Sequence, residues 1–250
     1  ARAIVPGQFI MVRLVGCDDP LLARPLALYD TVLDDDQMPI GLDIVYLVVG
    51  KMTARLARLR PGAELEIWGP LGNGFAPSDA DHLIMVAGGI GQTPFMALSR
   101  EALGSRTYGH PPRDSKRARR VSLCYGARSA ALLAGVPDFQ AAGVQVHVST
   151  DDGSHGHRGL VTDLLEQQLA TVATSASRVV TCGPEPMMEA AARICAAQQV
   201  PCQVSLETPM ACGVGICFSC VTRVRQGDGT WDYKRTCVDG PVFDAECIAW

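Results

Sequence analysis

Four cysteines near the carboxyl end of the chain have a spacing that could hold an iron–sulfur cluster. They follow the pattern C-x4-C-x2-C-x16-C, in which three share one loop and the fourth is remote: Cys212, Cys217, Cys220 and Cys237. This is the plant-type spacing for a [2Fe–2S] cluster, in which each tetrahedral iron carries two bridging sulfides and needs two thiolates. The alternatives are unliganded thiols or a four-thiolate zinc site, although zinc ribbons carry two C-x2-C knuckles and this segment has one. Glycines at 213 and 215 would let the loop wrap closely and direct backbone N–H groups at the sulfurs.

A glycine-rich turn earlier in the chain could approach a phosphate. It reads G-G-x-G-x-T-P, follows an apolar segment and opens a helical one. Gly88, Gly89 and Gly91 permit a tight turn, and the helix start offers free N–H groups and a positive dipole end. Thr93 supplies a capping hydroxyl and Pro94 suits the first turn of the helix. The pattern differs from the G-x-G-x-x-G fingerprint, so an ordinary strand–helix turn is the alternative.

Two further motifs could face a ligand. Cys182, Gly183 and Pro184 end an apolar strand and turn the chain into a helix. Strand ends of this kind line the ligand crevice of parallel sheets, so Cys182 could lie near a cofactor, although most free cysteines are small buried hydrophobes. Arg24 precedes the rigid Pro25, and its guanidinium could pair with a phosphate; an ordinary surface arginine is the equal alternative.

Three regions of different composition would have to position these groups. Residues 1–76 are rich in short β segments broken by Pro-Gly and Asp turns. Residues 77–206 alternate apolar strands with helical segments, which is typical of a parallel sheet with crossover helices. Residues 207–250 have little periodicity and would depend on a cofactor for order. The short strands of residues 1–76 suggest a small barrel or a sandwich. With the barrel preferred, the predicted fold class is an α+β multidomain protein: an N-terminal antiparallel β-barrel, an α/β parallel-sheet nucleotide-binding domain and a small C-terminal [2Fe–2S] lobe.

The individual elements follow from the hydrophobic period and from turn residues. We expect strands over 8–15, 25–33, 40–49, 63–68, 83–87, 121–125, 144–149, 178–182 and 202–206. We expect helices over 52–60, 94–103, 160–169 and 186–199. The basic stretch at 116–120 is interpreted as part of a solvated surface loop rather than an anion site.

Composition excludes several classes of function. The chain has 250 residues, a net charge of −4, 48% hydrophobic and 19% charged residues, which excludes a disordered chain and argues against a nucleic-acid partner. Its apolar runs are far shorter than the roughly 20 residues of a membrane span. Ten cysteines with local clustering indicate a metal or redox site in a reducing cytoplasm rather than a disulfide framework.

Taken in order, these motifs resemble a known family: R-P-x-x, then G-G-x-G-x-T-P, then C-G-P-x-x-M, then the four cysteines. The chain looks like the electron transfer subunit of NAD-dependent (type 1B) dihydroorotate dehydrogenase, in the ferredoxin–NADP reductase superfamily. The resemblance covers nearly the whole chain, and residues 69–75, 150–154 and 233–245 are especially similar. The family's barrel has a further strand before residue 1 that is absent here, and a start at Ala1 rather than at a methionine is consistent with a trimmed N-terminus.

The resemblance implies an FAD site in the β region. Its contacts would be Arg24, Pro25, Leu26 and Ala27, a second segment Val45, Tyr46 and Leu47, and a third segment Met52 and Thr53. Three of these depart from the family pattern: Ala27 replaces a serine, Leu47 an arginine and Met52 a glycine. FAD binding would therefore rely on other donors for the flavin phosphates.

The resemblance also implies an NAD site at the glycine turn and the following strand end. NAD would contact Gly88, Gly89, Gly91, Thr93 and Pro94, with Gly183, Pro184 and the catalytic candidate Cys182 near the nicotinamide. A flavin between cluster and nicotinamide is chemically required, because nicotinamide exchanges a hydride and the cluster exchanges single electrons. The five cysteines other than Cys182 and the four predicted ligands are interpreted as structural or incidental thiols.

The implied partner is an FMN-containing dihydroorotate dehydrogenase catalytic subunit, in a cytoplasmic heterotetramer of two copies of each subunit that serves pyrimidine biosynthesis. Exposed aromatic residues such as Trp231 or Trp250 could be interface anchors, although local core is the preferred interpretation. One alternative is a subunit of another NAD(P)H-linked iron–sulfur flavoprotein, of the ferredoxin:NADP oxidoreductase or hydrogenase type. A second alternative is a zinc-stabilised non-enzymatic binding module.

Overall fold

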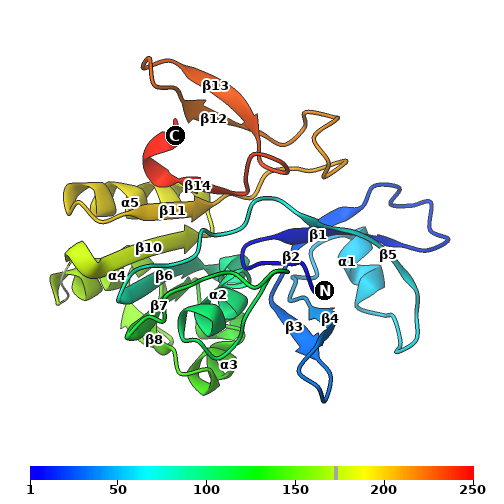
Figure 1. Ribbon diagram of the computed structural model, residues 1–250, viewed down its shortest axis with the longest axis horizontal. Helices are drawn as coiled ribbons and strands as arrows, with labels where there is room; N and C mark the ends of the chain where they lie inside the picture. Colours follow the sequence, from blue (N-terminus) through cyan, green and yellow to red (C-terminus); the bar gives the residue numbers. More distant parts are fainter. Residues whose placement is uncertain (172–173) are drawn as a thin grey trace.

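The structure, a computed structural model, describes residues 1–171 and 174–250. Three parts follow one another along the chain (Figure 1): an N-terminal β region, a central α/β region and a C-terminal segment that ends in a hairpin and a short strand. Mixed α and β structure was predicted, with antiparallel sheets first and a parallel sheet in the centre, and both features are present. No helix of the described ranges has the length and apolar character that crossing a membrane requires.

The N-terminal region contains two antiparallel sheets and one short helix. In the first sheet β1 lies between β2 and β5, and in the second β3 pairs with β4. The bounds are β1 Phe9–Leu14, β2 Arg24–Ala27, β3 Asp30–Leu33, β4 Pro39–Asp43, α1 Lys51–Leu56 and β5 Leu65–Leu71. Ile10, Val12, Leu28 and Met52 are buried together between these elements.

Two strand predictions in this region were wrong in extent. The expected strand over 25–33 is divided, because the chain changes partner between Leu28, whose N–H donates to Gln8, and Tyr29, whose N–H donates to Asp43. The expected strand over 40–49 ends at Asp43, and residues 44–50 continue without regular structure. β2 is an edge strand of its sheet, and the 44–50 segment begins with Ile44 packed on the N-terminal core and Val45 packed on the core of the central region.

The central region is built on a seven-stranded sheet with the order β14-β11-β10-β6-β7-β8-β9. Its strands are parallel except β14, which pairs antiparallel with β11. The bounds are β6 His82–Gly88, β7 Arg120–Ala127, β8 Gln145–Thr150, β9 His157–Arg158, β10 Ser177–Cys182, β11 Cys202–Ser205 and β14 Val242–Asp244. The short strand β14 brings the end of the chain back to the sheet edge.

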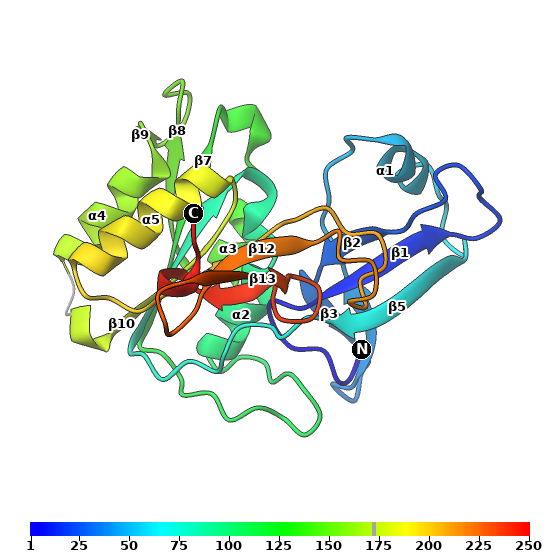
Figure 2. The same ribbon diagram turned by 90° about the horizontal axis from the view of Figure 1, so that it is seen from above.

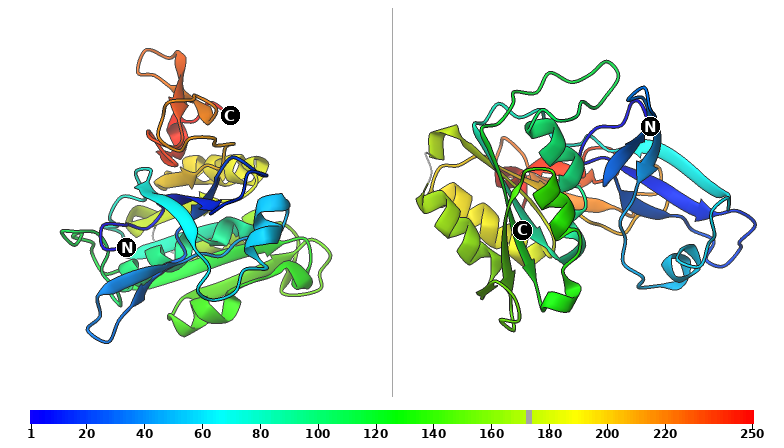
Figure 3. Two further views of the ribbon diagram at one scale, coloured as in Figure 1. Left: turned by 90° about the vertical axis from the view of Figure 1, so that its right-hand side faces the viewer. Right: turned by 90° about the horizontal axis from the view of Figure 1, so that it is seen from below.

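Helices cover both faces of this sheet (Figures 2 and 3). Successive residues of β6 point to opposite sides: Met85 packs into the core under α2 and α3, whereas Ile84 packs under α4 and α5. Such continuous burial on two faces is typical of a central parallel strand. The bounds are α2 Phe95–Ala102, α3 Val136–Ala141, α4 Val161–Ala170 and α5 Glu185–Ala197, with short 3-10 turns η1 Gly89–Gln92, η2 Ala130–Leu132, η3 Thr174–Ala176 and η4 Ala245–Cys247.

The C-terminal segment has more regular structure than its sequence suggested. β12 Val221–Arg225 and β13 Trp231–Arg235 form an antiparallel hairpin. Ala245 and Ile248 pack on α5 and β11, where the partly buried Trp250 joins them as local core, in line with the preferred interpretation. Trp231, by contrast, is half exposed on the hairpin, so the same interpretation was wrong for that residue.

Candidate cofactor sites at the strand ends and in the cysteine loop

The glycine turn and the Cys-Gly-Pro motif meet at the carboxyl edge of the parallel sheet. β6 and β10 are neighbouring parallel strands, so their ends lie side by side. A Cβ on Gly91 would overlap the carbonyl oxygen of Cys182, and one on Gly88 would lie 2.6 Å from Cδ of Pro184. Gly183 lies directly against Gly88. The two predicted nucleotide motifs therefore form one continuous surface in which a side chain at Gly91 has no space.

The opposite face of this turn is open. Gly89 has a φ of +55°, and no atom lies within 4 Å of the position of its Cβ. This combination leaves the backbone of the turn accessible to a ligand, as a phosphate-binding turn requires. Because the strand ends also define the crevice in which open α/β sheets bind ligands, the location fits a nucleotide.

The predicted helix cap at Thr93 is absent. The helix α2 begins at Phe95, its N-cap residue is Pro94, and no side chain caps it. Thr93 instead continues the 3-10 turn with helical dihedral angles, and its N–H donates to Ile90 at 3.0 Å. A capping residue needs an extended backbone, which a continuous helical turn does not provide. Both residues remain in the turn, with Thr93 buried.

The Cys182 side chain lies at the end of β10, partly buried against the main core. Burial raises the pKa of its thiol to about 12; the Glu207 carboxylate raises it further, and a hydrogen bond with Ser205 opposes the shift. The thiol is therefore protonated at neutral pH and adds no negative charge at the strand ends. Glu207 follows β11 and lies on the chain between this edge and the cysteine loop.

The first predicted flavin segment coincides with β2. Pro25, Leu26 and Ala27 are half buried, and Pro25 lies opposite Met11 of β1. The exposed guanidinium of Arg24 folds back on its own chain, donating to the carbonyl groups of Leu22 at 2.9 Å and Ala23 at 3.1 Å. It has no carboxylate partner among the described residues. Arg24 is thus a cation available to an anionic ligand.

The other two flavin segments lie after β4 and at the start of α1. Val45 and Tyr46 are half buried, and Leu47 begins a solvent-exposed apolar run that ends at Val49, which is 82% exposed. Met52 points inward and is buried in the β core, so its longer side chain does not obstruct the surface. Thr53 is buried, and its hydroxyl accepts hydrogen bonds from the Val49 and Gly50 N–H groups.

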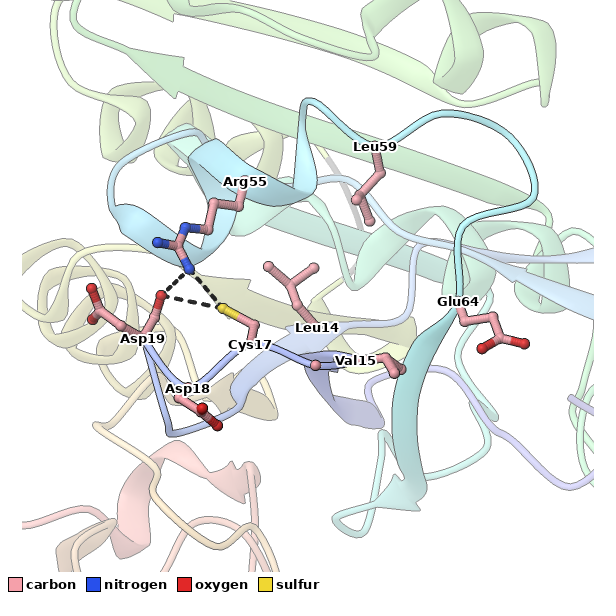
Figure 4. Close-up of a pocket in the computed structure, with 9 residues that line it drawn as sticks. Leu14, Val15, Cys17, Asp18, Asp19, Arg55, Leu59 and Glu64 are labelled. Carbon is pink, nitrogen blue, oxygen red and sulfur yellow. Dashed lines mark hydrogen bonds between the residues drawn. The ribbon is translucent and has the colours of Figure 1, made fainter.

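The side chains of these three segments fit the flat ring of a flavin better than its diphosphate. The apolar surface of Leu47 and its neighbours suits a flat hydrophobic ring, whereas Arg24 is the one cationic side chain that the three segments supply for a diphosphate. Two nearby cations are already engaged: Lys51 pairs with Asp19 at 2.9 Å, and Arg55 donates to Cys17 Sγ at 2.7 Å and to the Asp19 carbonyl. Figure 4 shows Arg55 with Cys17 and Asp19. These three residues line a separate pocket, whose volume is about 480 Å³.

The four predicted cluster cysteines come together as two pairs. Cys217 lies within hydrogen-bonding reach of Cys212, and Cys237 lies within reach of Cys220. The first pair is half to fully exposed, whereas the second is buried. Within the described ranges no three His, Cys, Asp or Glu side chains converge on one metal position. Two pairs of thiols fit a two-iron cluster, in which each iron takes two thiolates, better than a single tetrahedral ion.

Backbone and hydroxyl donors surround these sulfurs. The Val214 N–H donates to Cys212 Sγ at 3.4 Å, and the Gly215 N–H points to the Cys237 sulfur. The Ser219 hydroxyl and N–H lower the pKa of Cys217 to about 6, with a smaller effect from Cys212. Burial, followed by contact with Cys220, raises the pKa of Cys237 to about 12. Donors aimed at sulfur stabilise thiolates and are the usual surroundings of a bound cluster.

The buried cysteine pair packs directly on the N-terminal sheet. Cys220 and Cys237 share a core with Phe9, Met11 and Ala23. Ala23 immediately precedes Arg24, so the cysteine loop and the first flavin segment lie on neighbouring parts of one sheet. Figures 1 and 2 show the loop before β12 crossing over β1.

Sequence reasoning missed several residues that hold the loop in place. The Thr236 N–H and hydroxyl both donate to the Cys220 carbonyl, at 2.8 and 2.9 Å. Trp68 and Asn73 contact the same region from β5 and the turn after it. Their partners lie 144 and 169 residues away, and no local pattern signals contacts of that range.

Comparison with known proteins agrees with this arrangement. Residues 85–193 match the oxidoreductase NAD-binding domain family, and residues 207–249 match the iron–sulfur cluster binding domain of dihydroorotate dehydrogenase B. A solved structure of the NADH-dependent reduced ferredoxin–NADP oxidoreductase is 28% identical, with a TM-score of 0.78 over 99% of this chain and 80% of the other. The fold and the site define an NAD-linked iron–sulfur oxidoreductase of the ferredoxin–NADP reductase superfamily.

Curated relatives narrow this class to one family. The electron transfer subunit of dihydroorotate dehydrogenase B (NAD⁺) from Geobacillus kaustophilus is 38% identical over 96% of this chain and 85% of its own length. The corresponding subunit from Caldanaerobacter subterraneus subsp. tengcongensis is 36% identical with the same coverage. The chain therefore belongs to the electron transfer subunits of NAD-dependent dihydroorotate dehydrogenase B.

Proposed function

We propose that this chain receives electrons from a dihydroorotate-oxidising partner and delivers them to NAD⁺ in pyrimidine biosynthesis, using a [2Fe–2S] cluster and FAD. When bound, the cluster exchanges single electrons, the flavin exchanges one or two, and nicotinamide accepts a hydride. The observation that carries the proposal is the packing of a paired four-cysteine loop on the sheet that bears Arg24. Regions 1–76, 77–206 and 207–250 would serve FAD, NAD and the cluster respectively, with β14 from the last region completing the central sheet.

The cluster would be held by Cys212 and Cys217 on one iron and by Cys220 and Cys237 on the other. The contacts within each pair support this assignment. The N–H of Val214 and the hydroxyl of Ser219 would stabilise the exposed thiolates. The buried pair would face the N-terminal sheet, where it is shielded from water.

NAD would bind along the strand ends of the central sheet. The residues assigned to it are Gly88, Gly89, Gly91, Thr93 and Pro94 from the turn, and Cys182, Gly183 and Pro184 from the neighbouring strand end. The open face at Gly89 supports a phosphate contact there, and the protonated thiol of Cys182 would pack beside the nicotinamide without competing for its charge.

FAD would lie along β2 and the 44–50 segment, between the cysteine loop and the strand ends. Its assigned contacts are Arg24, Pro25, Leu26, Ala27, Val45, Tyr46, Leu47, Met52 and Thr53. Arg24 would bind the diphosphate and the exposed apolar run would cover the ring. Because the three segments offer a single cation, we propose that flavin retention depends strongly on Arg24.

The partner would be an FMN-containing catalytic subunit, two copies of each forming a cytoplasmic heterotetramer. Apolar side chains are exposed around the outer cysteine pair: Val214, Ile216, Phe218 and Val238. Ile216 is 80% exposed, and the Arg235 guanidinium lies 5.1 Å from the centre of the Phe218 ring. An exposed apolar group of this kind, rimmed by a cation, is typical of a protein interface. It would bring a partner next to Cys217.

A second candidate partner follows from one comparison. The similarity to the NADH-dependent reduced ferredoxin–NADP oxidoreductase extends over 99% of the chain, so a partner of that type is the alternative. Affinity purification of the tagged chain from its own organism under anaerobic conditions separates the two. We expect an FMN protein to co-purify and the resulting complex to reduce NAD⁺ when given dihydroorotate; co-purification with a ferredoxin-dependent NADP reductase instead would overturn the assignment.

A further inference from the structure

One short segment of the chain contacts the C-terminal region, residues 207–250, at two places: at the first predicted cluster ligand and again after the last one. It begins on β5 and ends in the turn that follows, from Trp68 to Asn73. The lobe depends on such contacts, because its buried cysteines share their core with residues of β1 rather than with a core of their own. Both ends of residues 68–73 make hydrogen bonds to it.

Trp68 contacts the start of the cysteine loop. Its indole N–H donates to the carbonyl oxygen of Cys212 at 3.1 Å. Trp68 lies opposite Met11 in the sheet, and a Cβ on Gly213 would come 2.6 Å from Cγ of Met11. The backbone around the first predicted ligand therefore rests on β1 and β5 with no space for another side chain.

Asn73 contacts the segment that follows the fourth predicted ligand. Its N–H donates to the Gly240 carbonyl at 2.7 Å, and its side-chain amide donates to the Val242 carbonyl at 2.7 Å. The amide oxygen in turn accepts the N–H of Val242 at 3.1 Å. This reciprocal pairing fixes the path of the chain between Cys237 and β14.

We propose that residues 68–73 form a clasp that positions the cysteine loop against the sheet of β2, β1 and β5, which carries the first flavin segment. Trp68 and Asn73 are positioning residues: neither would touch the cluster, but together they fix the backbone of the loop at its first ligand and the chain after its last ligand. The clasp leaves the outer apolar surface free for a partner. This inference rests on the proposed cluster at the four cysteines.

The test uses the full chain in complex with its catalytic subunit. Trp68→Phe keeps an apolar ring and removes the indole N–H; Asn73→Asp keeps size and removes the donated amide. We measure the rate at which an iron chelator bleaches the visible absorption, and the electron paramagnetic resonance spectrum of the reduced cluster. Loss of one hydrogen bond should accelerate iron release about fivefold in Trp68→Phe. We expect about tenfold in Asn73→Asp, with broadened resonance lines in both variants.

Trp250→Phe is the matched control, since Trp250 is also partly buried and its indole makes no hydrogen bond within the described chain. The dissociation constant for NADH reports on the central sheet and should stay unchanged in all variants. Iron release and resonance spectra equal to wild type in both clasp variants would overturn the clasp, as would equal acceleration by Trp250→Phe. Wild-type protein without iron and sulfide would instead refute the proposed cluster. If Trp68→Phe fails to accumulate, Asn73→Asp carries the test by the same criteria.

Discussion

The nucleotide turn and the cysteine loop are positioned in different ways. The turn connects adjacent elements of a large sheet, and its glycines fit against the neighbouring strand with no space to spare. The cysteine loop has two buried sulfurs packed on a sheet formed some 200 residues earlier, and hydrogen bonds from that sheet hold both its ends. One site is therefore built by adjacent elements of a single sheet, whereas the other depends on contacts with a remote part of the chain.

Removal of a cluster ligand should have the largest effect, and it should affect the cysteine loop without affecting the nucleotide turn. In Cys237→Ser, the loss of one thiolate should abolish the visible and paramagnetic signals of the cluster. NADH binding to the central sheet should persist, because the turn does not depend on the lobe. Cys247→Ser, a cysteine outside the loop, is the control and should retain the full signal. A complete cluster signal in Cys237→Ser would remove that residue from the ligand set.

The next largest effect should come from breaking the ion pairs that join the N-terminal and central regions, and it should be a loss of folding stability. Asp30 is buried and accepts ion pairs from Arg100 at 2.7 Å and Arg106 at 2.9 Å, with the Tyr108 hydroxyl donating at 2.6 Å. Asp30→Asn leaves two arginines without their counter-charge, so it should lower the free energy of unfolding by about 3 kcal/mol. Urea denaturation measures the change in the free energy of unfolding. A loss below about 1 kcal/mol would show that water solvates the charges of these arginines when the carboxylate is absent.

Two glycine variants of the nucleotide turn should separate packing from ligand access. Gly91→Ala places a methyl group on the Cys182 carbonyl and should cost about 3 kcal/mol of stability as well as NADH binding. Gly89→Ala meets no neighbour, so it should cost only the left-handed strain of about 1 kcal/mol. A bulkier residue at 89 should raise the KM for NADH and leave flavin content unchanged. An unaltered KM would place NAD elsewhere.

Lowering the pH should decrease the folding stability by a smaller amount, through a buried histidine of the central sheet. Burial, with help from Arg120 and His147, lowers the pKa of His82 to about 4. The unfolded chain takes up this proton near pH 6.5 and the folded chain near pH 4, so stability falls as pH drops through that window. We expect His82 to account for about 2 kcal/mol between pH 7 and pH 5. Urea titrations of His82→Gln should show a shallower pH dependence, with His147 leaving a residual slope; an unchanged slope would contradict this assignment.

Sequence patterns predicted much of the central region because its signals are local. The apolar strands β6 and β7 and the helix α5 all lie where the sequence predicted them. The six-residue α3 was missed because it is short and follows a glycine, and the hairpin of β12 and β13 was missed although Asp228-Gly229 lies between two alternating runs. That turn signal was available in the sequence.

At the cysteine site, too, local features could be predicted from the sequence and long-range contacts could not. The spacing of four residues predicts the ligands, since cluster geometry constrains which cysteines can share an iron. It does not predict that Trp68 and Asn73 meet the loop, because those contacts depend on how two sheets pack across the whole chain. Nor could spacing show that Met52 points into the core, which decides whether it would obstruct a flavin.

The most direct test of the account is the iron and acid-labile sulfide content of anaerobically purified chain. A [2Fe–2S] cluster predicts about two of each per chain, with visible absorption that bleaches on reduction. One zinc per chain, or neither metal nor sulfide, would contradict the central claim that the paired cysteines bind a two-iron cluster.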